Sequence, residues 1–393
     1  MNTATIPSLD YDLYDDTVLE DPYPCYRALR DAGPVAWLPR NKLYAMGRHA
    51  DVMAALRTPA LFSSAQGVAA NEETNRISRG NLLASDPPQH TLLRKVVGAP
   101  LMPAALAEIR PLIEAEAVAL VEQLVARRSF DAAVDLAHHL PLTIVAKLVG
   151  LPEEGRQNML RWSAATFDAL GGANERCEAA RPLTMEMRSY VQRHAGPTQV
   201  RPGSWAARLY QQGEAGVVAK ELCPVLMRDY LGPSLDTTIL ATGSTIALFA
   251  RHPDQWDVLR ANPALIPAAI NEVLRLESPV RGFTRVLTAA HEVDGTALPE
   301  GARVVLLFAS ANRDERKWPE PERFDIRRTL TGSLGFGAGI HMCAGQHLAR
   351  MEIAALLSAL IPRVARFEAK TAVPFRNNTL RGLQRLDVVV HPV

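Results

Sequence analysis

The sequence has little of several features that would indicate other classes of protein. Its 393 residues include only four cysteines, none in a CxxC pair, so neither a zinc site nor a disulfide framework is indicated. Lys and Arg total 43 against 42 for Asp and Glu. This balance argues against a positive electrostatic field over the whole protein that would attract nucleic acid or an anionic membrane. The acidic N-terminal stretch lacks the apolar run of a signal peptide or anchor. We expect a cytoplasmic protein in which most cysteines are buried thiols.

The chain also lacks internal repeats, low-complexity tracts and Gly/Ser linkers, so we expect a single domain over residues 1–393. Apolar residues at helical spacing dominate, as in 106–128 and 267–277. Short strands are expected in 34–46, turning at Arg40-Asn41, and in 291–308, turning at Asp294-Gly295 and Glu300-Gly301. These patterns predict a mainly α fold with minor β content.

The longest helical pattern runs from 222 to 250, and its second half is apolar nearly all round. Arg228, Asp229 and Asp236 interrupt it well before the roughly 20 apolar residues that a membrane span needs. We therefore expect a buried central helix.

One stretch, GFGAGIHMCAGQHLARMEIA (335–354), places glycines and a histidine ahead of a single cysteine, with a helical pattern over 348–360 behind it. A helix N-terminus favours a thiolate and lowers its pKa. Glycines let the backbone pass close under a flat cofactor. The stretch therefore indicates a haem cradle with Cys343 as the axial ligand; the simpler alternative is a buried cysteine in a glycine-rich loop. The positions that form this pattern are Phe336, Gly337, Gly339, His341, Cys343 and Gly345.

This pattern resembles the haem-binding signature of the cytochrome P450 family, and the resemblance extends over almost the whole chain. It implies a triangular prism in which haem b lies between the long central helix and the helix after Cys343. It also implies that Glu272, Arg275 and Arg323 form a buried charge network that braces the cysteine loop.

The resemblance implies four side chains that hold the haem propionates. His90 and Arg94 are four residues apart, on one face of an expected helix. His341 and Arg285 occupy the other two family positions, and an arginine fork suits a carboxylate.

By the same resemblance, Asp236 and Thr237 are the acid and the alcohol that protonate bound dioxygen. The sequence departs from the family at Pro233 and Ser234, which replace a small residue and a glycine. We expect Pro233 to hold the central helix open permanently, and the Ser234 hydroxyl to add a polar contact in the oxygen groove.

Two further stretches, SANRDERKW (310–318) and PFRNNTLRGLQRL (374–386), resemble a bacterial subgroup that O-demethylates para-substituted benzoates. This likeness implies an aromatic substrate against Phe167, Leu170 and Phe283, with Val280 beside the haem and Pro233 on the central helix. The subgroup's carboxylate-binding positions correspond to Gln66, Arg228 and Asp229. Because a cation is lost at Gln66 and an anion is gained at Asp229, we expect a neutral methoxy- or alkyl-arene rather than a benzoate.

The resemblance therefore implies a monooxygenase that uses O2 and electrons from a separate 2Fe-2S ferredoxin and its NAD(P)H-dependent reductase, with no role for nucleic acid or membrane. Two alternatives stay open. A peroxide-driven peroxygenase would share the haem cradle but usually replaces the acid-alcohol pair. A non-catalytic haem sensor would need no such pair.

Overall fold

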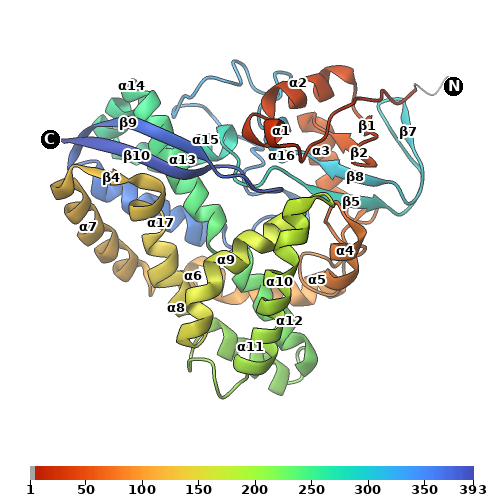
Figure 1. Cartoon of the computed structure of the whole chain (residues 1–393), viewed down its shortest axis with the longest axis horizontal. Coiled ribbons are helices and arrows are strands. Elements are labelled where there is room, and N and C mark those ends of the chain that lie inside the picture. The colour runs from red at the N-terminus through yellow and green to blue at the C-terminus, as the bar shows by residue number, and fades with distance from the viewer. Residues whose placement is uncertain (1–4) are drawn as a thin grey trace.

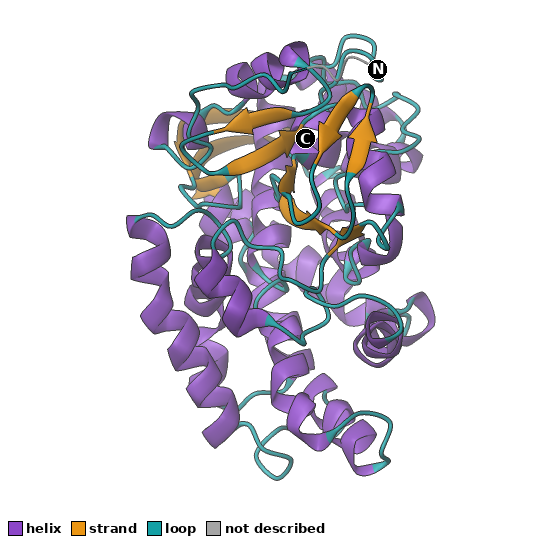
Figure 2. Cartoon of the chain, turned by 90° about the vertical axis from the view of Figure 1, so that its right-hand side faces the viewer, coloured by secondary structure: helices purple, strands orange, loops and turns teal. Residues whose placement is uncertain are grey.

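The computed structural model describes residues 5–393, and helices predominate in it, with 52% helix and 13% strand. Figure 2 shows the strands gathered at one end of the molecule and a helical layer at the other. The predicted fold class is therefore confirmed. The helices are α1 (Asp16–Glu20), α2 (Tyr23–Ala32), α3 (His49–Arg57), α4 (Glu72–Ser78), α5 (Gln89–Gly98), α6 (Pro103–Leu106), α7 (Arg110–Arg127), α8 (Ala146–Val149), α9 (Glu153–Ala169), α10 (Glu175–His194), α11 (Trp205–Glu214), α12 (Cys223–Leu231), α13 (Asp236–Arg251), α14 (Pro253–Ala261), α15 (Ile266–Leu276), α16 (Phe308–Ala311) and α17 (Gln346–Leu360).

The strands form three small sheets, with orders β1-β2-β8-β5-β3, β4-β10-β9 and β6-β7. Two of the three predicted turns close hairpins, since Ala36 pairs with Ala45 across the first hairpin and His291 with Leu298 across the second. The strand after Glu300-Gly301 leaves that hairpin and joins the five-stranded sheet instead. The strands are β1 (Ala36–Leu38), β2 (Leu43–Met46), β3 (Phe62–Ser63), β4 (Ser129–Asp131), β5 (Phe283–Leu287), β6 (His291–Val293), β7 (Thr296–Leu298), β8 (Arg303–Leu306), β9 (Val364–Pro374) and β10 (Leu383–Pro392).

The core is built around α13, which crosses the middle of the molecule (Figure 1). Nearly all of its side chains are buried, and it packs against α15, α17, β9 and β10. A helix that is apolar on every side is stable only when protein covers every side. The second half of the predicted central helix is thus buried as expected.

The expected opening of the central helix at Pro233 is present as a full break, because the chain leaves the helix at Gly232 and resumes at Asp236. Pro233 cannot donate a backbone hydrogen bond to the carbonyl of Asp229 and sterically opposes continuation. Three hydroxyls bond the carbonyls at the break: Ser163 donates to Gly232, Ser234 to Tyr230, and Thr237 to Pro233 at 3.1 Å. The interruption is therefore a hydrogen-bonded structure of its own.

One stretch, residues 132–149, is long and apolar enough by composition to cross a membrane, and 56% of it is buried inside the protein. Leu136, Leu140 and Ile144 in this stretch belong to the main hydrophobic core. Apolar packing in the core therefore accounts for this stretch.

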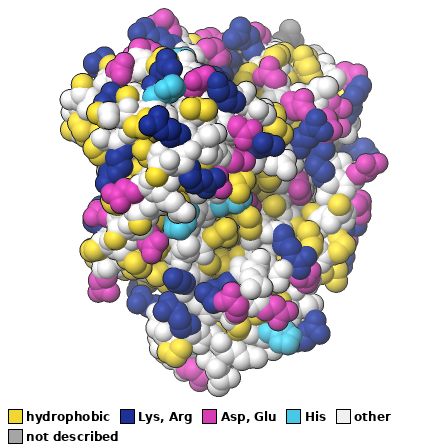
Figure 3. All heavy atoms as spheres, turned by 60° about the vertical axis from the view of Figure 1, so that its left-hand side comes forward, with side chains coloured by type: hydrophobic (Ala, Val, Ile, Leu, Met, Phe, Trp, Pro, Cys, Tyr) yellow, Lys and Arg dark blue, Asp and Glu magenta, His cyan; other side chains and the backbone are white. Residues whose placement is uncertain are grey.

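Figure 3 shows acidic and basic side chains interspersed over one face, with hydrophobic side chains between them.

Candidate functional site

The cysteine loop lies between a short 3-10 turn, Gly339–His341, and the start of α17. The Cys343 backbone N–H donates to the Phe336 carbonyl at 2.9 Å, which closes the loop under the thiol. Gly337 and Gly339 have left-handed φ values of 69° and 67°. A Cβ at Gly339 would lie 2.0 Å from the Leu56 carbonyl oxygen, so glycine is required there by the neighbouring backbone as well as by φ.

Cys343 differs from the other three cysteines, which are buried, because its side chain has accessible surface. Burial raises the pKa of the Cys343 thiol, and the backbone N–H groups of Gly345 and Gln346, together with Arg94 and Arg350, act in the opposite direction. The help expected from the helix start is present, and burial, the largest effect, opposes it. The sulfur is accessible to a ligand.

Four nitrogen-bearing side chains converge beside this loop. The rings of His90 on α5 and His341 lie with centroids 4.3 Å apart. Burial lowers the pKa of His341, and Arg285, His90 and Arg94 lower it further. Arg285, on β5, is 3% exposed and its pKa falls to about 10 through burial. The four side chains that the sequence singled out are therefore neighbours in space.

These four side chains fit the two propionates of a haem. The Nε2 atoms of His90 and His341 are buried without a hydrogen-bond partner, and within residues 5–393 neither Arg94 nor Arg285 forms a salt bridge. Buried polar nitrogens of this kind need acceptors, and carboxylates are the acceptors that arginine prefers. A thiol at one side and such donors at another suit an iron porphyrin.

A buried charge network braces the loop from behind. Arg275 and Glu272 on α15 are both fully buried and form a bidentate pair, with N–O distances of 2.7 and 2.9 Å. The guanidinium of Arg275 also donates to the carbonyl of Asn312 at 2.9 Å. The third side chain is Arg328, whose Nε lies 3.2 Å from Glu272. The prediction of Arg323 is wrong, because its guanidinium pairs with exposed Glu320 and only its carbonyl meets Arg275.

The break between α12 and α13 presents Asp236 and Thr237 at the first turn of α13. Asp236 is 5% exposed, and its Oδ2 has no hydrogen-bond partner. Burial raises its pKa to about 7; a hydrogen bond with Ser163 acts against this, and Asp168 adds to it. A carboxyl group with a pKa near neutrality can accept and return a proton.

Apolar side chains from four segments pack together next to these groups, and we refer to this cluster of packed side chains as the apolar pocket. Its buried members are Phe167, Leu240 and Leu380, and its partly buried members are Leu170, Val280, Phe283 and Phe375. Leu240 lies three residues after Thr237 on α13, so both lie on one helix face. Phe283 and Arg285 are two apart on β5 and share a strand face. The pocket therefore adjoins the acid-alcohol pair and the propionate donors.

The three positions expected to meet a carboxylate do not all come together, although the charges of Arg228 and Asp229 act on each other. Gln66 is exposed, and its carbonyl accepts from Arg303 at 3.3 Å. Asp229 accepts from the backbone N–H of Leu82 at 3.0 Å, and burial raises its pKa to about 7. Arg228 is half-buried. Burial lowers the pKa of Arg188 on α10, and the positive charge of Arg228 lowers it further. The sequence indicated neither Arg328, which bonds to Glu272, 56 residues away, nor Arg188, which lies near Arg228.

Comparisons with known proteins agree with this geometry. A family model described as Cytochrome P450 matches residues 250–383. The curated protein Cytochrome p450 CYP199A2 of Rhodopseudomonas palustris is 37% identical, over 99% of this chain and 96% of its own length. Linalool 8-monooxygenase of Pseudomonas putida is 32% identical, over 97% of this chain and 98% of its own. The structure of cytochrome P450 CREJ in complex with (4-ethylphenyl) dihydrogen phosphate matches with a TM-score of 0.87 at 25% identity, covering 97% of this chain and 99% of that one.

Proposed function

The chain belongs to the cytochrome P450 family, and from this premise we propose that it hydroxylates or O-demethylates a small, neutral aromatic substrate. It is an oxidoreductase whose cofactor is a haem with cysteine-ligated iron. The observation that carries the proposal is the apolar pocket, in which the rings of Phe167, Phe283 and Phe375 lie together with aliphatic side chains. The similar structure of CREJ, solved with an aryl phosphate, supports an aromatic ligand in this fold.

In this proposal Cys343 ligates the iron, and His90, Arg94, Arg285 and His341 hold the propionates. Phe336, Gly337 and Gly345 shape the loop beneath the porphyrin. The bound haem supplies the activation of O2 for insertion into a C–H bond, and the thiolate favours cleavage of the O–O bond. The protein's part is orientation, proton supply and exclusion of water.

The substrate ring lies between Phe167 and Phe283, with Leu170 and Val280 beside it. Aromatic faces and edges hold a flat ring in a fixed orientation, which places one substituent toward the thiolate side. The reaction takes up O2, two electrons and two protons, and gives the hydroxylated product and water. For an aryl methyl ether, the hydroxylated methyl group is a hemiacetal that collapses to a phenol and formaldehyde.

Proton supply is assigned to the first turn of α13. Thr237 donates its hydroxyl proton to the Pro233 carbonyl, so its oxygen is free to accept a hydrogen bond from a water or an oxygen ligand. Asp236 lies one residue earlier, with a carboxyl oxygen that has no partner and a pKa of about 7. We assign to Asp236 the capture of protons from solvent and to Thr237 their positioning at the reacting oxygen.

Electrons come in this proposal from a separate 2Fe-2S ferredoxin that docks on the face nearest Cys343. Lys95 is exposed there on α5, and Leu92 and Met342 are 42% and 41% exposed. Basic and apolar groups together suit an acidic carrier protein. We propose further that the whole chain is one domain and acts in the cytoplasm.

Turnover of 4-methylanisole with a bacterial 2Fe-2S ferredoxin, its reductase and NADH tests this function. We expect one formaldehyde and one 4-methylphenol for each productive NADH. Hydrogen peroxide in place of the electron carriers should support less than a tenth of that rate, because the acid-alcohol pair is intact. Turnover with peroxide that equals turnover with ferredoxin would establish a peroxygenase instead.

A further inference from the structure

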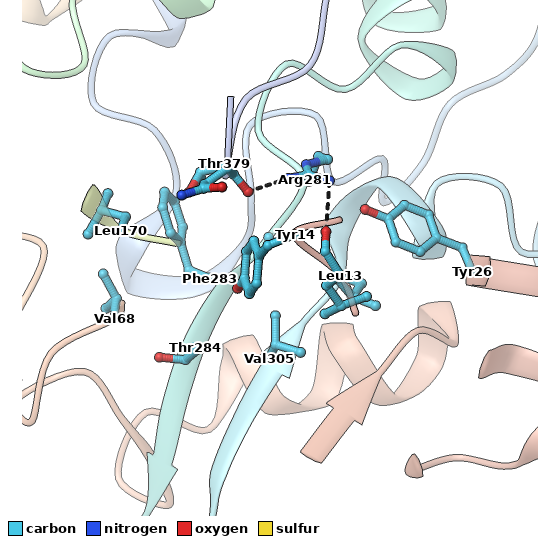
Figure 4. A pocket seen from close by; sticks show the side chains of 13 residues that line it. Leu13, Tyr14, Tyr26, Val68, Leu170, Arg281, Phe283, Thr284, Val305 and Thr379 are labelled. Carbon is cyan, nitrogen blue, oxygen red and sulfur yellow. Dashed lines mark hydrogen bonds between the residues drawn. The ribbon is translucent and has the colours of Figure 1, made fainter. Parts of the chain in front are cut away.

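A small cavity lies outside the haem site, between the N-terminal segment, β5, β8 and the loop before β10 (Figure 4). Its volume is about 20 Å³, which is room for a single water-sized group. Tyr14, Tyr26 and Arg281 face it together with the apolar side chains of Val305 and Leu307. The cavity is therefore small, with polar and apolar side chains in its wall and one cationic group among them.

Arg281 is deeply buried, with 4% of its surface exposed. Its two terminal nitrogens donate to backbone carbonyls, one to Leu13 at 3.4 Å and the other to Asn377 at 3.3 Å and to Asn378. The Nε–H has no hydrogen-bond partner. One donor of this guanidinium is thus buried and unused next to the cavity.

Arg281 also has no counter-ion in contact. Within residues 5–393, no carboxylate oxygen lies within 4 Å of its nitrogens, whereas buried Arg275 and Arg30 are both ion-paired. Asp168 feels Arg281 electrostatically, but it is occupied by the backbone N–H of Asn378 at 2.8 Å. A buried charge without a partner is strongly unfavourable, so this cavity has a positive potential.

The neighbouring tyrosines stay neutral. Burial raises the pKa of both Tyr14 and Tyr26, so both hydroxyls stay protonated near neutral pH and can donate a hydrogen bond. Tyr26 lines the same cavity as Arg281. The charged group in the wall is thus a guanidinium, and the other polar lining residues, Tyr14, Tyr26, Thr284, Asn378 and Thr379, are neutral.

We propose that this cavity binds one small monovalent anion of halide size, held by the Arg281 Nε–H and the Tyr26 hydroxyl. A charge-assisted hydrogen bond would satisfy the unused donor, and a monatomic anion would fill a cavity too small for a ring or a branched carboxylate. Thr284 also lines the cavity, but its hydroxyl already donates to the Ala69 carbonyl at 2.9 Å.

The site lies directly behind the apolar pocket, because Leu170 and Phe283 line both. An anion that fixes Arg281 also fixes the segment carrying Val280 and Phe283. We therefore expect halide to tighten the binding of an aromatic ligand several-fold. This coupling rests on the proposed function, whereas the anion site itself does not.

The test measures the thermal unfolding midpoint of the holoenzyme in sodium chloride, sodium bromide and sodium gluconate at equal ionic strength. We expect a saturable rise with chloride and bromide over gluconate, which is too large for the cavity. Arg281→Gln should raise the half-saturating bromide concentration at least tenfold. Arg385→Gln, which removes an exposed arginine paired with Asp387, should leave it unchanged.

Bromide also gives a direct position, from anomalous scattering in crystals of the wild-type holoenzyme. A peak beside Arg281 Nε supports the proposal, and no peak together with no halide-specific stabilisation means that the cavity holds water and overturns it. If Arg281→Gln does not fold, Tyr26→Phe should still weaken bromide binding several-fold. If bromide stabilises the protein but aromatic ligands cause no Soret shift, the anion site stands and the proposed substrate class fails.

Discussion

Burial sets the chemistry of individual carboxyl groups in this protein. It raises the pKa of Asp236 and Asp229 to about 7 and that of Glu352 to about 8, in each case as the largest effect. Only Asp236 lies next to a hydroxyl at the helix break, so only Asp236 is placed to exchange protons with the reacting oxygen. Sequence alone could identify the acid-alcohol pair but not this pKa, because the pKa depends on α9, which packs over α13.

Replacing the pair should separate oxygen consumption from product formation. We expect Asp236→Asn to slow turnover by about 10²-fold, the lower range for loss of a positioned proton donor. Thr237→Ala should keep oxygen consumption but divert most of it to hydrogen peroxide. NADH, formaldehyde and peroxide measured together check both variants. Thr238→Ala is the matched control, since Thr238 is buried on the neighbouring position of the same helix.

The charge network gives a second residue-level prediction. Arg328→Met removes one partner of fully buried Glu272, whereas Arg323→Met removes only a surface pair with Glu320. Loss of the last partner of a buried charge lowers the free energy of unfolding by about 3 kcal/mol or more. Because Arg275 still pairs with Glu272 in the Arg328 variant, we expect a loss of about 1 to 2 kcal/mol there. For the Arg323 variant we expect a loss of about zero. Denaturant unfolding and haem content check this. Equal losses in both variants would restore the original assignment of Arg323.

The helices show which features of an element the sequence could predict. The patterns over 106–128 and 267–277 correspond to α7 and α15, because one-sided apolar spacing fixes where a helix packs. The sequence predicted that Pro233 opens the central helix, but it did not predict the full break over residues 232–235. Its carbonyls are bonded partly by Ser163, which lies on α9. A contact with another element leaves no mark in the local sequence.

Pro233 gives the prediction at this scale. Pro233→Ala restores an N–H that can bond to the Asp229 carbonyl, and alanine is the strongest helix former. We expect α12 and α13 to move toward one continuous helix, with slower amide exchange at residues 233–236. The yield of product per NADH should fall, because Thr237 would then be held by the regular helix. Unchanged amide exchange and unchanged yield would contradict a role for Pro233 in fixing the break.

For the whole molecule, buried acids make stability depend on pH. Glu352 on α17 is 1% exposed, its Oε1 has no partner, and burial raises its pKa from 4.5 to about 8. Between these two values the folded state binds more protons than the unfolded state. Stability from this group is therefore fully present below about pH 4.5 and is lost as the pH rises toward 8.

Glu352→Gln should remove this loss. We expect the variant to be more stable than the wild type at pH 8 by an amount on the order of 1 kcal/mol or more, and about equal near pH 5. Denaturant unfolding of the holoenzyme at several pH values measures it. Glu368→Gln is the control, because Glu368 is exposed with a lowered pKa and should leave the slope above pH 5 unchanged.

The haem site is the part of the molecule that sequence predicted best, and the substrate region the part it predicted least. Cys343 and the four side chains proposed to hold the propionates lie in short segments with fixed spacings, and the structure places His90, Arg94, Arg285 and His341 together. In the region proposed for the substrate, by contrast, Gln66 is exposed. Arg188 of α10, which the sequence did not indicate, lies near Arg228. Substrate contacts come from segments whose spacing is set only by the complete fold.

The most direct test of the account is a spin-state titration of the ferric holoenzyme. The Soret band is followed during addition of 4-methylanisole, of cyclohexyl methyl ether as a non-aromatic match, and of 4-methoxybenzoate. We predict a low-spin to high-spin shift with 4-methylanisole, at least tenfold weaker binding of the aliphatic ether, and weak binding of the benzoate. Equal binding of the aromatic and aliphatic ethers would contradict an aromatic pocket at Phe167 and Phe283, and tight binding of the benzoate alone would contradict a neutral substrate.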